Sequence, residues 1–492
     1  MEEVEVAPPR AHEVRIRILC TSLCHTDVTF WRMKDFPGQH PIILGHEAAG
    51  VVESVGEHVH EVAVGDTVVP VFSAQCGDCP DCLSDRSNIC SGLPAGLGMP
   101  RDGTTRFSFA ATGEPIHNFI GVSSFTEYTV VDVSNVVRIG PGVPPEKACL
   151  LSCGVSTGVG AAWKVAAVEP GSSVAVFGLG VVGLAVAQGC RMRGAKQIIG
   201  VDLNPEKRDI GKRLGITDFI NPNDTGEKAV SEVVKEMTGG GADYCFECIG
   251  STSAMAEAFQ SSRKGWGKTI VLGVSSGGAP MSIPPHDILW GRSVVGSLFG
   301  GLKPKTDIPI LAQKYLDEEL ELDEFVTHEM GFDDINAAFE LLTQGKCLRH
   351  FQMRKTIFDS LYHCILSYDD YFILKKDVVG TIGLSGYQKC MIAFQMLAYG
   401  TAANSWDEYI RMPESTCGEA MVRFAIAMVE VSEPQYLREP TVTDTERLLA
   451  ISEARGWPGV IFVSTISNPV GQKKTQGLFD SRDSGNAGIG KI

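Results

Sequence analysis

The chain lacks the marks of an exported, membrane-spanning or nucleic-acid-binding protein. Its start, MEEVEVAPPR, is acidic and polar and has neither the cationic start nor the apolar stretch of a secretory signal. The most apolar run, residues 174–190, is interrupted by glycines and is too short to span a bilayer comfortably. The formal net charge is −16, from 43 Lys and Arg against 59 Asp and Glu, which argues against a general affinity for phosphate backbones or anionic lipid. We therefore expect a cytoplasmic protein that binds a small molecule, not a membrane or a nucleic acid.

The chain also has no internal repeat, and its apolar content is not depleted. With 492 residues, of which 44% are hydrophobic and 21% charged, it can form several globular domains. The 15 cysteines occur in a large chain without an export signal. In that setting cysteines are more often metal ligands, reactive thiols or core residues than disulfide partners.

The order of the expected elements indicates an α/β protein with two different domains. Residues 1 to about 154 carry short β-like runs separated by turn residues. From about residue 169 to 299, apolar β runs alternate with helical stretches, which predicts a doubly wound parallel sheet. Residues 300–357 return to mixed patterns that could complete the first domain. The stretch 358–459 is expected to be helical, and the polar, Gly-rich residues 460–492 are expected to be disordered.

Four cysteines lie close together in the loop QCGDCPDCLSDRSNIC. Their spacing, C-x2-C-x2-C-x7-C, allows four thiolates to surround one zinc ion. A four-thiolate set leaves no open coordination position, so a structural role is predicted. The alternative is chance clustering in a turn-rich loop. The residues are Cys76, Cys79, Cys82 and Cys90.

A glycine-rich turn follows the β run SVAVF and precedes a helical stretch. Gly178, Gly180 and Gly183 form the G-x-G-x-x-G pattern, which lets backbone N–H groups approach a pyrophosphate at a helix start. Asp202 ends the next β run, where a carboxylate can bind the ribose diol of NAD and repel the 2′-phosphate of NADP. Lys207 could stabilise the adenosine ribose. The alternative is a βαβ unit whose glycines serve packing only.

Three further groups are far apart in the sequence, each where a β run ends: CHTD, GHE and SCG. Taken alone, His46 is more often a core histidine, and Cys24 or Cys153 a small buried apolar residue. Together the three supply the Cys, His and Cys of a catalytic zinc site with one open position. Asp27 or Glu47 could orient the imidazole or tune the metal.

The motifs CHTDVTFW, ILGHEAAG, CGDCPDC, CGVSTG and GLGVVG resemble zinc-dependent medium-chain alcohol dehydrogenases of the plant alcohol dehydrogenase-like branch, over residues 1–350. The resemblance implies a GroES-like catalytic domain (1–154 and 298–357), which would lack its first β-hairpin, and a Rossmann NAD-binding domain (155–297). It implies a homodimer with two zinc ions per chain. By resemblance, Cys24, His46 and Cys153 hold the catalytic zinc, and Glu47 lies behind it. The resemblance also implies that Thr26 begins proton release and that Phe72 lines the substrate pocket. Of the cofactor, the pyrophosphate would be contacted by His25 and Arg349, and the nicotinamide would lie beside Thr157 and Val182.

The implied reaction is the transfer of a hydride between an alcohol and NAD, giving an aldehyde or ketone. Two alternatives remain: glutathione-dependent formaldehyde oxidation on the same scaffold, and a catalytically silent fusion protein. Thr29 stands where some relatives have the histidine that ends the proton relay, so the sequence does not assign the route by which the proton reaches bulk water. Residues 351–459 resemble the N-terminal helical region of plant Harbinger-type transposase-derived proteins but contain no nuclease carboxylate after GWPG. An accidental join is the main hypothesis for this segment, and a helical interaction module the second.

Overall fold

The structure is a computed structural model of the whole chain, and it describes residues 2–33, 40–93, 100–275, 280–343, 351–354, 371, 389 and 422–424. The chain divides into two compact units, Met1–Thr356 and Ile357–Ile492. In the second unit, the Lys389 ammonium donates a hydrogen bond to the carbonyl of Tyr371 at 3.0 Å. Almost all of the expected helical segment 358–459 and the whole of the tail 460–492 lie outside the described residues.

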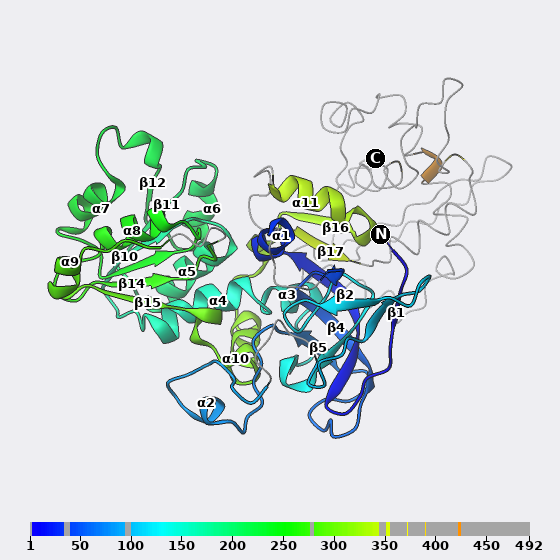
Figure 1. The fold of residues 1–492 in the computed structure, drawn as a ribbon. Helices are drawn as coiled ribbons and strands as arrows, with labels where there is room; N and C mark the ends of the chain where they lie inside the picture. Colours follow the sequence, from blue (N-terminus) through cyan, green and yellow to red (C-terminus); the bar gives the residue numbers. More distant parts are fainter. Residues whose placement is uncertain are drawn as a thin grey trace, which may run out of the picture. The chain divides into compact units, whose positions relative to one another are not determined.

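A parallel sheet forms the centre of one part of the first unit (Figure 1). Val174, Ala175 and Val176 of its central strand are fully buried, as expected for a parallel sheet covered by helices on both faces. The strand order, which includes the crossover between β10 and β13, is β12 (Asp218–Ile220), β11 (Gln197–Val201), β10 (Ser173–Phe177), β13 (Tyr244–Glu247), β14 (Lys268–Val271) and β15 (Ser293–Gly296). The helices of this part are α4 (Gly154–Gly160), α5 (Val181–Met192), α6 (Lys207–Leu214), α7 (Val230–Thr238), α8 (Thr252–Ser261) and α9 (Pro285–Leu289).

The order of these strands reverses between β10 and β13. From β10 the chain proceeds to β11 and β12 on one side, and then crosses to β13, β14 and β15 on the other. Turns that leave neighbouring strands in opposite directions leave a gap at this switch point, and open α/β sheets bind ligands there. The predicted doubly wound parallel sheet is confirmed.

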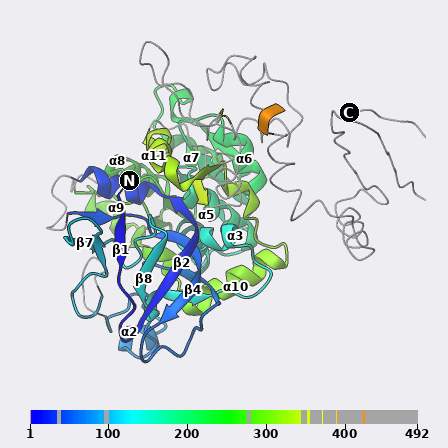
Figure 2. The same ribbon diagram turned by 90° about the vertical axis from the view of Figure 1, so that its right-hand side faces the viewer.

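The other main sheet is built around the long strand β2 (Glu13–Leu23). It pairs antiparallel with β4 (Glu47–Val55), β8 (Tyr128–Asp132) and β17 (Phe351–Arg354), and three of these four strands are labelled in Figure 2. Strands β5 (Thr67–Pro70), β9 (Val136–Arg138) and β16 (His328–Gly331) extend it. Residues that follow the parallel sheet in sequence thus return to the sheet of β2, while the exact domain boundaries given above remain a prediction.

Smaller elements complete the first unit. A second antiparallel pairing joins β1 (Val4–Val6), β6 (Phe107–Phe109) and β7 (Pro115–Asn118), with β3 (Ile42–Ile43) parallel to β7. The remaining helices are α1 (His25–Arg32), α2 (Pro80–Leu83), α3 (Pro145–Leu150), α10 (Pro304–Leu316) and α11 (Ile335–Thr343). Within the described part of the chain, no helix has the length and apolarity needed to cross a membrane.

The two main sheets share one core through α4 and α5. An added Cβ at Gly158 of α4 would come within 2.3 Å of the Val182 carbonyl of α5, so only glycine permits this approach. The continuous cluster of buried apolar residues includes Cys20 and Ala49 from the β2 sheet as well as Val174 and Val176 from the parallel sheet. This packing brings the start of α4, with Cys153, between the two sheets.

Candidate zinc and dinucleotide sites

The first site begins where β2 ends and α1 starts. Cys24 is the N-cap of α1, with an extended backbone at φ −105° and ψ 155°. Asp27, three residues later, accepts a hydrogen bond from the Cys24 backbone N–H through Oδ2 at 3.0 Å. This capping contact fixes the first helical turn, so the Cys24 side chain is held at the N-terminus of the helix.

The other oxygen of Asp27 orients His46. Asp27 Oδ1 lies 2.9 Å from His46 Nδ1 and also accepts the Gly45 backbone N–H at 3.1 Å. Because a carboxylate oxygen accepts, Nδ1 carries the hydrogen and Nε2 is the free coordinating atom. His46 Nε2 is buried and has no hydrogen-bond partner of normal geometry among the described residues. A buried imidazole nitrogen that carries no hydrogen and accepts no hydrogen bond of normal geometry is suited to coordinate a metal ion.

Cys153, which precedes α4, completes the cluster. One donor atom each from Cys24, His46, Glu47 and Cys153 lie within 4.8 Å of one another. Two thiols and an imidazole are donors that zinc prefers, and three protein ligands leave a fourth position open. The residues therefore fit a zinc ion of the catalytic type, with the Glu47 carboxyl beside it.

The protonation equilibria of this cluster are strongly perturbed. The hydrogen bond with Cys153 lowers the pKa of the Cys24 thiol, and the nearby His46 lowers it further against the effect of burial. The hydrogen bond with Cys24 and burial raise the pKa of the Cys153 thiol. Burial opposes protonation of His46, but Asp27 and the Cys24 sulfur outweigh it, so its pKa is raised well above the usual value. Metal binding would replace the protons that remain on these groups.

Aromatic rings line the cluster on its apolar side. The ring of Phe72 packs edge-on against His46 with centroids 6.0 Å apart, and Phe299 packs on Phe72 at 5.3 Å. Phe119 also packs on His46 at 6.0 Å and is fully buried. Phe119 was not found from the sequence, because nothing in the surrounding stretch HNFIGVSSF marks one phenylalanine as different. Its place comes from tertiary packing after β7.

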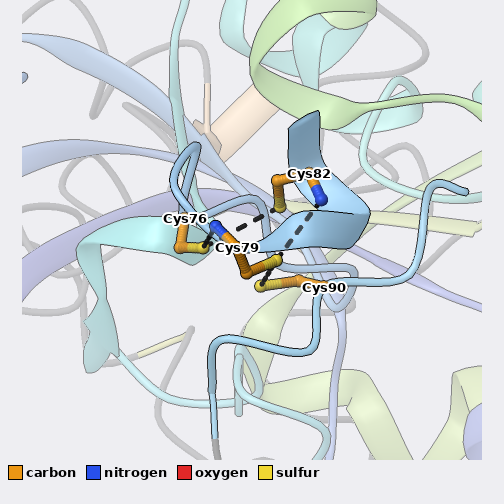
Figure 3. A group of neighbouring side chains, drawn as sticks. All are labelled: Cys76, Cys79, Cys82 and Cys90. Atoms are coloured by element: carbon orange, nitrogen blue, oxygen red, sulfur yellow. Dashed lines mark hydrogen bonds between the residues drawn. The ribbon is translucent and has the colours of Figure 1, made fainter. Parts of the chain in front are cut away.

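The four-cysteine loop forms a separate cluster, which Figure 3 shows with the four side chains converging. The Cys76 and Cys82 sulfurs are 3.9 Å apart, as are those of Cys79 and Cys90. Tetrahedral coordination with Zn–S bonds of about 2.3 Å places sulfurs about 3.8 Å apart, so the spacing fits zinc. The Cys82 backbone N–H lowers the pKa of Cys79 to about 5, whereas burial raises that of Cys82 to about 12.

The glycine-rich turn joins β10 to α5 at the switch point. Gly178 has φ +88°, and a Cβ there would lie 2.6 Å from Ile249 Cγ1. A Cβ on Gly183 would lie 1.8 Å from the Gly178 carbonyl oxygen, so the helix start must be glycine to pack on the turn. A Cβ on Gly180, the N-cap of α5, would meet no atom within 4 Å, which leaves its backbone open to a ligand. The helix dipole favours an anion at this point.

Asp202 lies at the carboxyl end of β11 beside the same turn. Its Oδ2 accepts the Leu179 backbone N–H at 2.7 Å, and its Oδ1 accepts that of Asn204 at 2.8 Å. The carboxylate is therefore held beside the glycine-rich turn. Lys207 is buried at the start of α6.

The other residues expected at the sites lie on three helices, except for one outside the described part of the chain. His25 is exposed at the first position of α1, Thr157 is buried in α4, and Val182 is half-buried in α5. Thr26, which is half-buried, follows His25 in α1. Arg349 lies outside the described residues.

Comparisons with known proteins agree with this arrangement. The alcohol dehydrogenase GroES-like domain matches residues 10–141, and the zinc-binding dehydrogenase domain matches residues 181–316. Alcohol dehydrogenase-like 7 of Arabidopsis thaliana is 58% identical over 353 residues, which are 71% of this chain and 90% of the relative. The chain belongs to the zinc-binding alcohol dehydrogenase family. It is an oxidoreductase, and its fold combines a GroES-like domain with a Rossmann-type parallel sheet.

Further relatives place the family in a wider setting. Alcohol dehydrogenase class-3 of Oryza sativa subsp. japonica is 49% identical over 352 residues, covering 71% of this chain and 92% of the relative. The crystal structure of benzyl alcohol dehydrogenase from Acinetobacter calcoaceticus has a TM-score of 0.65 and 29% identity, covering 72% of this chain and 94% of that one. The resemblance of residues 351–459 to transposase-derived proteins remains a prediction.

Proposed function

We propose that the chain is an NAD-dependent, two-zinc alcohol dehydrogenase that interconverts a primary or secondary alcohol with its aldehyde or ketone. The observation that carries this proposal is the convergence of Cys24, His46 and Cys153, which are far apart in sequence, at one buried point. The glycine-rich turn at Gly178 supplies the second half of the proposed site. Family membership favours the same reaction type.

In this proposal Cys24, His46 and Cys153 would hold the catalytic zinc. When bound, zinc acts as a Lewis acid that lowers the pKa of an alcohol hydroxyl and polarises a carbonyl. Asp27 keeps the hydrogen on His46 Nδ1 and so keeps Nε2 available. The Thr26 hydroxyl, two residues after Cys24, is proposed to accept the proton of the alcohol, and Glu47 to tune the charge behind the ligands.

The crevice residues would hold the dinucleotide. NAD, when bound, supplies the nicotinamide ring that takes up or gives back the hydride. Gly178, Gly180 and Gly183 let the backbone and the dipole of α5 bind the pyrophosphate, with His25 and Arg349 as further proposed contacts. Thr157 and Val182 would lie beside the nicotinamide. Asp202, supported by Lys207, favours the ribose diol of NAD and repels the additional phosphate of NADP.

The second zinc would be structural. Cys76, Cys79, Cys82 and Cys90 supply four sulfurs, so no position remains for a substrate. Two hydrogen bonds from the Lys303 ammonium, to the carbonyls of Cys82 and Ser84, tie this loop to the start of α10 at 2.8 and 2.7 Å. The free thiols of both clusters suit a reducing compartment such as the cytoplasm.

The substrate pocket is proposed to be apolar. Phe72 and Phe119 pack directly on His46, so an alcohol at the metal would have aromatic rings around its carbon atoms. Such a lining excludes water and favours an uncharged alcohol or aldehyde over a polyol or a sugar. It does not favour the carboxylates of a glutathione adduct, for which the described rings offer no charge complement.

A homodimer is the proposed assembly. Strand β15 is the edge of the parallel sheet in the described part of the chain, so its outer N–H and C=O groups can pair with a second copy. Leu289, Trp290 and Leu298 beside it are 82%, 54% and 52% exposed. An apolar border along an unpaired strand is typical of a β-edge interface.

The function is tested by following NADH formation with the purified full chain across a panel of primary and secondary alcohols. Activity with NAD and an apolar alcohol is expected, with a lower kcat/KM for NADP. Activity only with glutathione plus formaldehyde would replace the proposal by the formaldehyde-oxidising alternative. Binding of neither zinc nor NADH would favour a silent fusion protein.

A further inference from the structure

One buried carboxyl of the dinucleotide-binding part takes no role in the proposed reaction. Glu247 is the last residue of β13 and is completely buried. Its Oε1 accepts three backbone hydrogen bonds, from Ile249 at 3.0 Å, Gly250 at 2.8 Å and Ser251 at 3.3 Å. Its Oε2 is buried, and among the described residues it has no hydrogen-bond partner of normal geometry. A single oxygen therefore organises the whole turn that follows the strand.

That turn borders the crevice at the switch point. The Cys248 backbone N–H donates to the Phe177 carbonyl at 2.9 Å, so the turn starts beside the end of β10. The Ile249 side chain reaches the position where Gly178 has no Cβ. Because β10 and β13 are the two strands at which the sheet order reverses, a dinucleotide in the crevice would pass over both turns.

The turn has little freedom on its other side. Gly250 has φ +87°, and a Cβ there would lie 2.4 Å from the Val274 carbonyl oxygen. A Cβ on Gly273 would lie 2.6 Å from Glu247 Oε2 and 2.0 Å from the Gly250 nitrogen. The 248–251 turn is thus packed between the Gly178 turn and the end of β14. Its distance from the end of β13 depends on the length of the Glu247 side chain.

We infer that Glu247 is a positioning residue for the dinucleotide: through Oε1 it holds the 248–251 turn against the Gly178 turn, and it does so by reach and hydrogen bonding and not by charge. This inference rests on the proposed use of NAD. It extends that proposal by assigning the shape of the crevice to a carboxyl that touches neither zinc cluster.

Two observations favour hydrogen bonding over charge. Burial raises the pKa of Glu247, although the N–H groups of Gly250, Ile249, Ser251 and Gly273 act in the opposite direction. Among the described residues, the buried Oε2 accepts no hydrogen bond of normal geometry, and a neutral group costs less there. A glutamine, with the same length and one acceptor oxygen, should therefore replace Glu247, whereas an aspartate should not.

The test measures NADH binding by fluorescence titration, and ADP-ribose binding by calorimetry, on the full chain. Glu247→Asp keeps the carboxyl but shortens its reach, and the loss of three hydrogen bonds should raise the Kd for NADH about ten-fold or more. Glu247→Gln should stay within about two-fold, because it keeps an acceptor for each of these bonds. The KM for alcohol at saturating NAD should not change in either variant.

Asp243→Asn is the matched control. Asp243 directly precedes the amino end of the same strand, β13. It also accepts three hydrogen bonds, from the Ser173 N–H and hydroxyl and the Trp266 indole. Its replacement should lower the unfolding temperature and leave the Kd for NADH unchanged. Gly250→Ala, which displaces the same turn with Glu247 in place, should weaken NADH binding even if Glu247→Asp fails to fold.

The outcomes separate the two levels of the proposal. A wild-type chain that binds no NADH removes the proposed function and this inference with it. A wild-type chain that binds NADH, together with a Glu247→Asp variant of unchanged affinity, overturns the inference alone. The inference is also overturned if Glu247→Gln loses as much affinity as Glu247→Asp, or if Asp243→Asn weakens binding to the same extent.

Discussion

The two cysteine clusters use similar donors in opposite ways. The loop cluster takes four sulfurs from 15 consecutive residues, Cys76 to Cys90, and encloses its centre. The other takes Cys24, His46 and Cys153 from three separate elements, and a buried network through Asp27 fixes the imidazole. The comparison teaches that a closed, local set of ligands can stabilise a loop. A set assembled from distant elements can leave one coordination position open beside aromatic rings.

The largest expected effect is on turnover, from Cys24→Ser. Loss of this ligand removes a Lewis acid contribution of several kcal/mol, so kcat/KM should fall by about 10³-fold or more. Zinc content should fall by one ion per chain while the loop cluster keeps its own. Cys190→Ala, at a buried thiol of α5 away from both clusters, is the control and should retain both ions.

Next in size is the loss of the loop zinc in Cys82→Ser. Since the loop has little core of its own, the unfolding temperature should fall by about 5–10 °C, as a loss of a few kcal/mol implies. The remaining folded molecules should keep kcat/KM within about three-fold, because no donor of the other cluster changes. A fall in turnover equal to that of Cys24→Ser would show that the two clusters do not have separate roles.

Asp27→Asn should have an intermediate effect confined to the distant cluster. The amide can present a donor to His46 Nδ1 and so weaken the orientation of the ring; zinc affinity should fall by about 10–100-fold, as for other residues behind a metal ligand. Competition with a chelator gives the ratio of the zinc affinities of the variant and the wild type, with the loop cluster of the same chain as an internal standard. Equal release of both ions would contradict the role of Asp27.

The smallest effect is expected at Lys303→Met, which removes the two hydrogen bonds that tie the loop to α10. Hydrogen bonds from a charged donor contribute about 1.5–3 kcal/mol, so the unfolding temperature should fall by a few degrees with both zinc ions retained. Lys305→Met is the matched control, because the Lys305 ion pair with Glu61 involves a half-exposed carboxyl and should contribute little. If both variants behave alike, the link through Lys303 is not what anchors the loop.

The comparison also explains what could be predicted from the sequence. The alternation of β runs and helical stretches predicted the parallel sheet, because strand and helix periodicities are local properties. The four-cysteine hypothesis likewise needed only the spacing within one loop. The hypothesis for Cys24, His46 and Cys153 combined their donor types with a family resemblance, because spacing does not show that Cys153, more than 100 residues after His46, lies beside it.

Other features needed the structure. The sequence left open whether Asp27 or Glu47 orients the imidazole, and the 2.9 Å contact from Asp27 to His46 depends on how α1 packs against the start of β4. Phe119 and Glu247 had no sequence signal. Their roles depend on the elements that pack around them, namely the His46 ring for Phe119 and the 248–251 turn for Glu247.

The most direct test of the central claim is the zinc content of the wild-type chain and of Cys24→Ser, measured by elemental analysis and expressed per protein chain. The account predicts about two zinc ions per wild-type chain and about one per Cys24→Ser chain, with the remaining ion bound by four sulfurs in X-ray absorption spectra. A wild-type chain with one ion or none, or a Cys24→Ser variant that keeps two, would contradict it.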